Sequence, residues 1–186
     1  MHISQLVLKN LDTDLSQLSD LLSIEPQLDL VFGYTGHFAD PRLAQSLAQT
    51  FPEAQRVGCT TAGEITSAGV VNHTTVVTAI HFNSTPFTVA TAALPSMEHS
   101  FESGAALAGK IASTDLRAVL VLGQGVHING SAMIEGMVSM LGVSLPITGG
   151  LAGDDGEFVK TYTLSNEGVS TNQIVGIGFR GEQVLF

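Results

Sequence analysis

The sequence repeats one short motif of small residues, and this repeat limits the folds that are open to the chain. Cys-Thr-Thr-Ala-Gly-Glu at 59–64 reappears, loosened, as Gly-Gly-Leu-Ala-Gly-Asp at 149–154, about 90 residues later. Both segments follow an apolar run, and at the same offset Gly33 matches Gly123. A duplicated bend of this kind gives a protein two similar binding sites, or one site built from two halves. The pattern therefore favours a ligand-binding function over a catalytic one.

Hydrophobic periodicity predicts the same order of elements in two pseudo-repeats, about 1–83 and 84–181, within a single domain over 1–186. Each half is expected to run strand, helix, strand, helix and then several further strands. Helices are predicted to begin near Asp12 or Thr13, at Pro41, at Ser100 and near Ser131. Strands are predicted over residues 2–8, 28–32, 56–58, 75–82, 87–92, 118–122, 145–148, 158–164 and 173–179. We therefore expect an α/β fold of mixed sheets with helices packed on them.

Composition excludes several classes of partner. Hydrophobic residues make up 44% of the chain, which is typical of a folded domain, and the formal net charge is −10. Such a surface repels phosphate backbones and anionic lipids, which argues against nucleic acid and membrane as partners. The single cysteine, Cys59, rules out an intramolecular disulfide, and residues 1–8 do not resemble a signal peptide. A reducing cytoplasm is the expected location.

The glycine-rich segments fall where ligands bind in open α/β sheets, at the carboxyl ends of strands. Glycine lets the backbone approach a ligand closely, and bare N–H groups favour a carboxylate or a phosphate, whereas acidic side chains favour an ammonium group. The alternative is that these residues only make turns. The candidate ligand-binding residues are Cys59, Thr60, Thr61, Gly63, Glu64, Gly125, His127, Asn129, Gly149, Gly150, Gly153, Asp154 and Asp155.

Cys59 is the one candidate nucleophile that the motifs suggest. A reactive thiolate needs a base, and His37 or His127 would have to supply it, while a buried and inert cysteine is the alternative. No cysteine-protease signature surrounds Cys59, and the chain contains neither a dinucleotide fingerprint nor a phosphate-binding P-loop. The sequence therefore favours a protein that is not an enzyme, with a Cys59-dependent enzyme as the alternative.

Two of the six histidines are matched by the repeat, since His37 falls at the same offset as His127. The six show no ligand pair of the HExxH kind, so a zinc site is not supported. One neutral imidazole is enough to hold a haem iron, which makes His37 and His127 the candidate haem ligands. For either histidine, a structural or solvent-exposed role is the alternative.

Four segments carry a resemblance to a known family. Residues 57–65, 129–136, 145–155 and 176–179 resemble, in order, the motifs of the N-terminal part of the FIST sensory domain. The resemblance spans nearly the whole chain, and the customary C-terminal FIST segment has no counterpart in it.

The resemblance implies a cytoplasmic input domain of bacterial signal transduction. FIST domains are coupled to histidine kinases, cyclic-di-GMP enzymes or chemotaxis proteins, and small ligands such as amino acids have been proposed for them. Some relatives are described as haem proteins that sense nitric oxide. The leading hypothesis is a ligand-binding sensor that regulates a partner signalling protein. A second alternative to the sensor is a scaffold half-domain whose site is completed by another segment or subunit. A homodimer is one form of this alternative.

Overall fold

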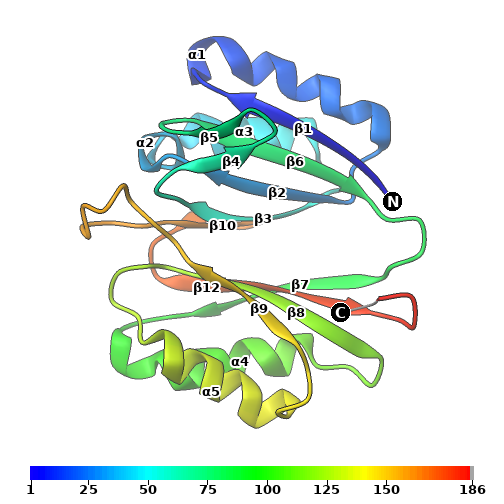
Figure 1. The fold of residues 1–186 in the computed structure, drawn as a ribbon, viewed down its shortest axis with the longest axis vertical. Helices are drawn as coiled ribbons and strands as arrows, with labels where there is room; N and C mark the ends of the chain where they lie inside the picture. The colour runs from blue at the N-terminus through cyan, green and yellow to red at the C-terminus, as the bar shows by residue number, and fades with distance from the viewer. Residues whose placement is uncertain (185–186) are drawn as a thin grey trace.

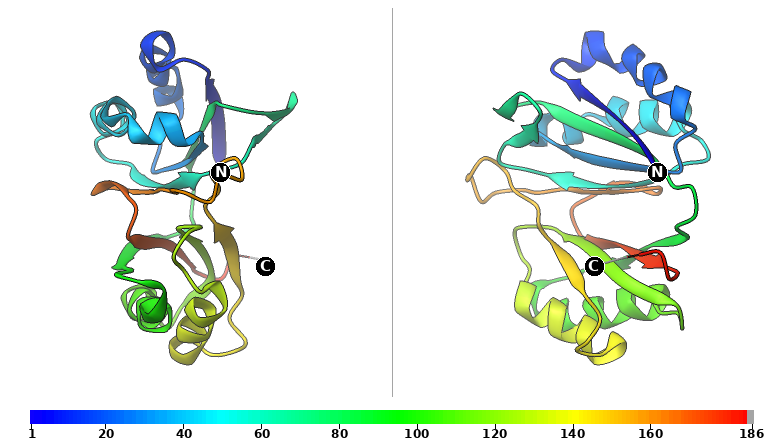
Figure 2. Two further views of the ribbon diagram at one scale, coloured as in Figure 1. Left: turned by 90° about the vertical axis from the view of Figure 1, so that its left-hand side faces the viewer. Right: turned by 45° about the vertical axis from the view of Figure 1, so that its right-hand side comes forward.

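Two main sheets face each other between two layers of helices in the computed structural model, which describes residues 1–184 (Figure 1). Two further views show the same order of layers, with helices outside each sheet (Figure 2). None of the helices within these residues has the length and apolar character needed to cross a membrane.

The elements follow each other in similar order in the two halves. The first half supplies β1 (His2–Leu8), α1 (Leu11–Asp14), the 3₁₀ helix η1 (Leu15–Ile24), β2 (Leu28–Gly33), α2 (Thr35–Ala39), α3 (Pro41–Thr50), β3 (Gln55–Thr60), β4 (Glu64–Thr66), β5 (Gly69–Val71) and β6 (Thr75–His81). The second half supplies β7 (Phe87–Ala93), the 3₁₀ helix η2 (Met97–His99), α4 (Ser100–Ile111), β8 (Leu116–Gly123), α5 (Gly130–Leu141), β9 (Ile147–Leu151), β10 (Thr163–Ser165), β11 (Gly168–Ser170) and β12 (Gln173–Arg180).

Both sheets are built on one plan. The first contains the order β1-β6-β2-β3 and the second the order β7-β12-β8-β9. In each, the last strand of the half inserts antiparallel between its neighbours, and the remaining pair, β2 with β3 or β8 with β9, is parallel. The hairpin β10–β11 extends the first sheet through β3, whereas β4 and β5 form a small sheet of their own. The predicted α/β fold with mixed sheets is confirmed.

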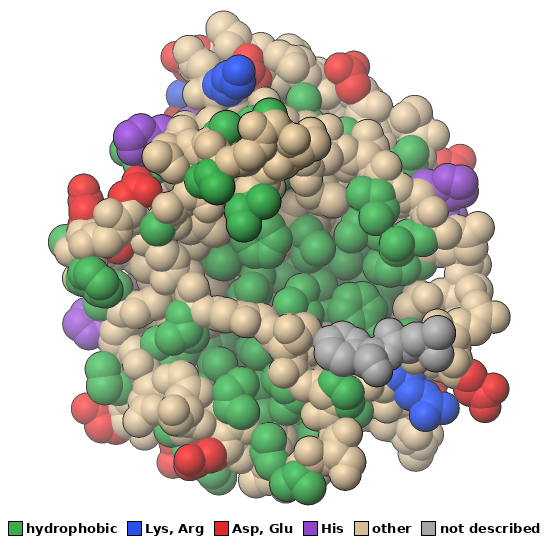
Figure 3. Space-filling view, viewed as in Figure 1, with side chains coloured by type: hydrophobic (Ala, Val, Ile, Leu, Met, Phe, Trp, Pro, Cys, Tyr) green, Lys and Arg blue, Asp and Glu red, His purple; other side chains and the backbone are tan. Residues whose placement is uncertain are grey.

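Alternating side chains divide the interior into a helix-covered core on each side and a central layer between the sheets. In β2, Val31 packs under the helices, while Leu28 packs toward the opposite sheet. Apolar side chains gather where the middle of one face is hollowed between the two sheets (Figure 3). The partly buried apolar residues of the central layer are Leu30, Phe32, Phe82, Phe87, Val89, Leu120 and Phe179.

The first predicted helix is only briefly an α-helix and then becomes the 3₁₀ helix η1. The apolar residues Leu15, Leu18, Leu21 and Ile24 recur at every third position, which suits three residues per turn better than 3.6. Leu22 falls outside this series and is exposed. Glu25 then ends the helix in the left-handed conformation, with φ of 52°.

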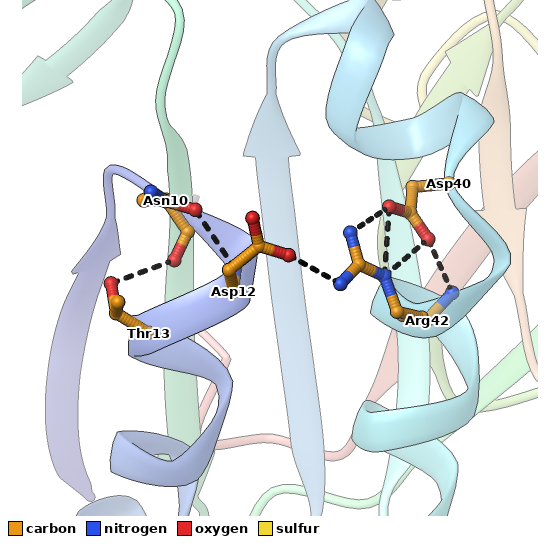
Figure 4. A network of polar contacts seen from close by, with 5 residues as sticks. All are labelled: Asn10, Asp12, Thr13, Asp40 and Arg42. Atoms are coloured by element: carbon orange, nitrogen blue, oxygen red, sulfur yellow. Dashed lines mark hydrogen bonds and ion pairs between the residues drawn. The ribbon is translucent and has the colours of Figure 1, made fainter.

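The predicted helix start at Pro41 is confirmed, and it carries the polar network of Figure 4. Asp40 accepts a hydrogen bond from the backbone N–H of Arg42 at 2.9 Å, as a helix N-cap does. The guanidinium of Arg42 also bridges Asp40 and Asp12, at 2.6 and 2.5 Å, and so ties α3 to α1. Asn10 caps α1 by accepting from the N–H of Asp12.

Two predicted strands differ from those observed. The strand expected over 145–148 is found as β9, Ile147–Leu151, so that Gly149 and Gly150 belong to a strand. The strand expected over 158–164 is mostly loop, and only β10 forms there. The carboxylate of Asp154 accepts from the N–H groups of Phe158, Val159 and Lys160, which directs those groups away from a strand ladder.

Candidate functional site

The first bend leaves the carboxyl end of β3 and is anchored by backbone hydrogen bonds. Cys59 and Thr60 lie within β3 and are buried, and Thr61 donates its N–H to the Gly33 carbonyl at 3.0 Å. Gly63 has φ of 131°, a conformation that side chains with a Cβ rarely adopt. This glycine turns the chain so that Glu64 points back into the protein.

Glu64 is the polar centre of this bend and is only 2% exposed. One carboxylate oxygen, Oε1, accepts from the Thr61 hydroxyl at 2.7 Å. The other, Oε2, accepts from the hydroxyl and the backbone N–H of Thr74 at 2.7 and 3.2 Å. Three donors therefore compensate for burial of the carboxylate and hold it in one orientation.

A cavity of about 360 Å³ lies beside Gly63 and Glu64. Its size is within the range of small-molecule sites, and its wall combines apolar surface with a few polar groups. Two other residues of the wall are bonded to each other, since Gln5 donates from its side-chain amide to the Thr78 hydroxyl at 3.0 Å. The lining residues are Gln5, Phe32, Thr61, Gly63, Glu64, Ile65, Val76 and Thr78.

The second bend corresponds to the first with a shift of one residue from the sequence match. Thr61 donates to Gly33, and Ala152 donates in the same way to Gly123 at 2.8 Å. Gly58 opposes Val31 in the parallel pair, and Gly149 opposes Val121. The structural offset is therefore 91 residues rather than 90 along this strand.

The two bends meet where the halves join, but they do not enclose a common hollow. Gly153 donates its N–H to the Thr60 carbonyl at 2.9 Å and lies close against Ala62. Asp154 is buried under its own loop. Burial alone would raise the pKa of Asp154, but the N–H groups of Val159, Lys160 and Phe158 outweigh it and lower that pKa. The acidic ends of the two motifs thus have different partners.

The remaining predicted residues are spread over the second half. Gly149 and Gly150 line a separate cavity of about 400 Å³ between β9 and α5. Gly125 donates its N–H to the Thr161 hydroxyl at 2.8 Å, and a Cβ there would overlap the Ala152 carbonyl. Asn129 is the N-cap of α5, where its side chain accepts from Ala132. Neither cavity is lined by Gly125 or Asn129.

Comparison with known proteins adds a family to this geometry. The sequence profile of the FIST N domain matches residues 27–186. The chain belongs to the FIST N domain family. FIST domains are a sensory family, which implies ligand binding and signalling as the general role.

No protein with curated annotation matches this FIST N domain. Among solved structures, a cyanuric acid hydrolase from A. caulinodans superposes over 98% of this chain and 67% of its own, with 12% sequence identity and a TM-score of 0.46. A likeness at that level carries no argument about activity.

Cys59 of the FIST N domain is a buried thiol in the layer between the sheets. Burial raises the pKa of Cys59 to about 12, so the thiol is protonated at neutral pH. The candidate base His37 is hydrogen-bonded elsewhere, with its Nδ1 2.9 Å from the Thr75 hydroxyl. Within residues 1–184, the Cys59 thiol is therefore not hydrogen-bonded to either candidate base, His37 or His127.

The residues of this FIST N domain do not fit a haem. Burial lowers the pKa of His37, against the negative charge of Glu64, so its imidazole is neutral at pH 7. His37 nevertheless lines neither of the cavities beside the bends, and His127 is exposed in a loop with φ of 62°. Within residues 1–184, no group of three or more His, Cys, Asp or Glu side chains is arranged to hold a metal ion.

Several residues around the first bend were not identified from the sequence. Tyr34 packs its ring 5.8 Å from that of His37 and 4.8 Å from that of His73, between centroids. His73 reaches the second bend, with its Nε2 3.5 Å from a carboxylate oxygen of Asp155. The sequence offered one indication for Thr74, because a polar residue just before a strand of apolar residues is suited to form a hydrogen bond with a neighbouring loop.

Proposed function

We propose that this FIST N domain binds a small amine-bearing molecule, such as an amino acid, in the cavity beside Gly63 and Glu64. The observation that carries the proposal is the buried Glu64 carboxylate in the wall of a cavity of about 360 Å³. Occupancy would be read by a partner signalling protein, such as a histidine kinase or a cyclic-di-GMP enzyme, as in the family that the chain resembles.

The cavity wall suits a ligand with a charged end and an apolar body. Glu64 Oε1 accepts only from Thr61 and retains a lone pair for an ammonium group. Because three donors already orient the carboxylate, little further ordering is needed on binding. Phe32 and Val76 offer apolar contact to the rest of the ligand.

The same carboxylate connects the cavity to segments that a partner could sense. Glu64 accepts a hydrogen bond from Thr74, which precedes β6. Glu64 is also the first residue of β4, in the β4–β5 hairpin. A ligand that binds one conformation of this hairpin more tightly than another would shift the population toward that conformation. Through Thr60, the bend also contacts Gly153 of the second half.

The proposal is tested by calorimetric titration with a panel of amino acids. At least one should bind saturably, and Glu64→Gln should weaken it at least about tenfold, because a hydrogen bond to a charged group is worth roughly 1.5–3 kcal/mol. Thr78→Val, at another residue that lines the same cavity, should also weaken binding. Unchanged affinity in both variants would place the ligand elsewhere.

The matched control for Glu64→Gln is Glu167→Gln, an exposed carboxylate in the turn of the other hairpin. This control should bind like the original chain. Melting curves of each variant separate a lost contact from a lost fold, since a folded Glu64→Gln chain that does not bind supports the site.

A further inference from the structure

The two hairpins of the chain are built alike. The strands β4 and β5 pair Ile65 with Val70, and β10 and β11 pair Leu164 with Val169. The glycine that begins each second strand, Gly69 in β5 or Gly168 in β11, has φ of 109° in both hairpins. Each hairpin thus presents one cross-strand apolar pair at the same place.

The same apolar pair is covered in one hairpin and bare in the other. Leu164 is 0% exposed, because β10 adds to the edge of β3 and packs into the core under α3 with Leu43 and Leu47. Ile65 is 80% exposed and Val70 is 71% exposed. Exposed apolar pairs on a strand hairpin indicate a contact that a single chain does not make.

The second sheet has the reciprocal feature. Its strand β9 corresponds to β3 but is the last strand of the sheet within residues 1–184, whereas β3 is followed by β10. Between β9 and α5 lies the cavity of about 400 Å³, lined by Met133, Ile134 and Ile147 among others. In the first half, the corresponding space next to α3 holds Leu164. One half therefore has an unused hairpin, and the other has an unoccupied edge.

We propose that the β4–β5 hairpin of one copy pairs with β9 of a second copy, and reciprocally, in a two-fold dimer. Each chain carries both the hairpin and the edge, so two copies use every such element, as a closed symmetric interface requires. Within one chain, β4 and β5 remain a separate sheet, so its own β9 is not the partner. The segments 147–151 and 65–71 have no charged residue, so the pairing brings no like-charged side chains of these segments together.

The internal contact also predicts the register of the new one. Leu164 lies opposite Gly58, and Gly58 corresponds to Gly149. Ile65 therefore comes to lie opposite Gly149 of the second copy, on the helix-facing side, where the cavity receives its side chain. Continuing the antiparallel ladder places Thr66 opposite Thr148 of the second copy.

The mass in solution tests the proposal, by sedimentation or light scattering. The chain should have twice the single-chain mass of 19.4 kDa. Ile65→Lys together with Val70→Lys should halve the observed mass and leave the circular dichroism spectrum unchanged, because both side chains are exposed in the single chain. Val143→Lys, at a residue that is 87% exposed outside both elements, should remain dimeric.

Two results overturn the proposal. One is a monomeric original chain, which would assign the hairpin to a different protein. The other is a dimer that persists in the double lysine variant, which would place the interface elsewhere.

Cysteine cross-linking tests the register. Directly opposite antiparallel residues are close enough for a disulfide, so a mixture of a Thr66→Cys chain and a Thr148→Cys chain should give a covalent pair on a non-reducing gel. Each variant alone should give none, and buried Cys59 should not react. No covalent pair in the mixture, or an internal disulfide in the double variant, would contradict the predicted pairing.

Discussion

Glu64 and Asp154 are both buried acidic residues at the end of the same short motif, yet they serve different purposes. Glu64 accepts from Thr61 and Thr74, and it faces a cavity. Asp154 accepts from three N–H groups within its own loop and closes that loop. Only Glu64 is therefore in a position to meet a ligand. The motif predicted an acidic residue at a bend, but the residues that satisfy it come from other segments.

Cys59 supplies the prediction that belongs to the residue scale. Because burial raises the pKa of its thiol to about 12, we expect alkylation by iodoacetamide only after unfolding in denaturant. Mass spectrometry of the folded chain should show no adduct. A Val143→Cys variant supplies an exposed thiol as the control and should gain one adduct at once. Fast, stoichiometric alkylation of Cys59 itself would instead support the Cys59-dependent enzyme.

At the scale of elements, the chain's own strand edges and hairpins decide how it assembles. The hairpins β4–β5 and β10–β11 have the same length and the same turn, but only the second has an edge to join. Helix starts are local, and the capping signal at Asp40 and Pro41 predicted α3 correctly. Strand pairing is not local, so β10 could not be assigned to the first sheet from its sequence.

Adjacent glycines of β9 should respond in opposite ways to alanine. At Gly149, φ is 136° and a Cβ would overlap the Val121 carbonyl, so Gly149→Ala should cost roughly 2 kcal/mol or more of unfolding free energy. At Gly150 a Cβ meets open space, and Gly150→Ala should be neutral or stabilise by up to about 1 kcal/mol. Denaturant unfolding measures both. Equal effects would contradict the register of β8 with β9.

At the scale of the whole molecule, two sheets built on one plan share a central apolar layer. One buried charge stands out beneath the helices of the first sheet. Neither carboxylate oxygen of Asp29 has a hydrogen-bond partner among the described residues. Burial raises the pKa of Asp29 to about 7, although the positive charge of Arg56 acts the other way.

This carboxyl group should make the stability of the fold depend on pH. Folding raises the pKa of Asp29 from 3.8 to about 7. The contribution of its protonated form to the free energy of unfolding is therefore complete below pH 3.8 and is lost as the pH rises through about 7. A shift of about three pKa units corresponds to roughly 4 kcal/mol. Asp29→Asn should remove this dependence and be more stable than the original chain at alkaline pH, as thermal unfolding measures.

The control for this prediction is Asp115→Asn. Asp115 is exposed, and its hydrogen bond from Ser113 lowers its pKa, so its linkage acts only at more acidic pH. The control should therefore keep the loss of stability between pH 3.8 and about 7. An Asp29→Asn variant with the same pH profile as the control would show that Asp29 is not the responsible group.

Most strands, the capped helices and the duplicated bends could be predicted without a structure, because apolar periodicity, N-caps and glycine act over a few neighbouring residues. The family followed from motifs that are equally local. The tertiary structure alone decided that Glu64 bonds Thr74 and borders a cavity, that Gly153 closes against Thr60, and that one hairpin is left without an edge. These features depend on hydrogen bonds and packing between segments far apart in the chain, and a one-residue shift in strand register changes the face on which each side chain lies.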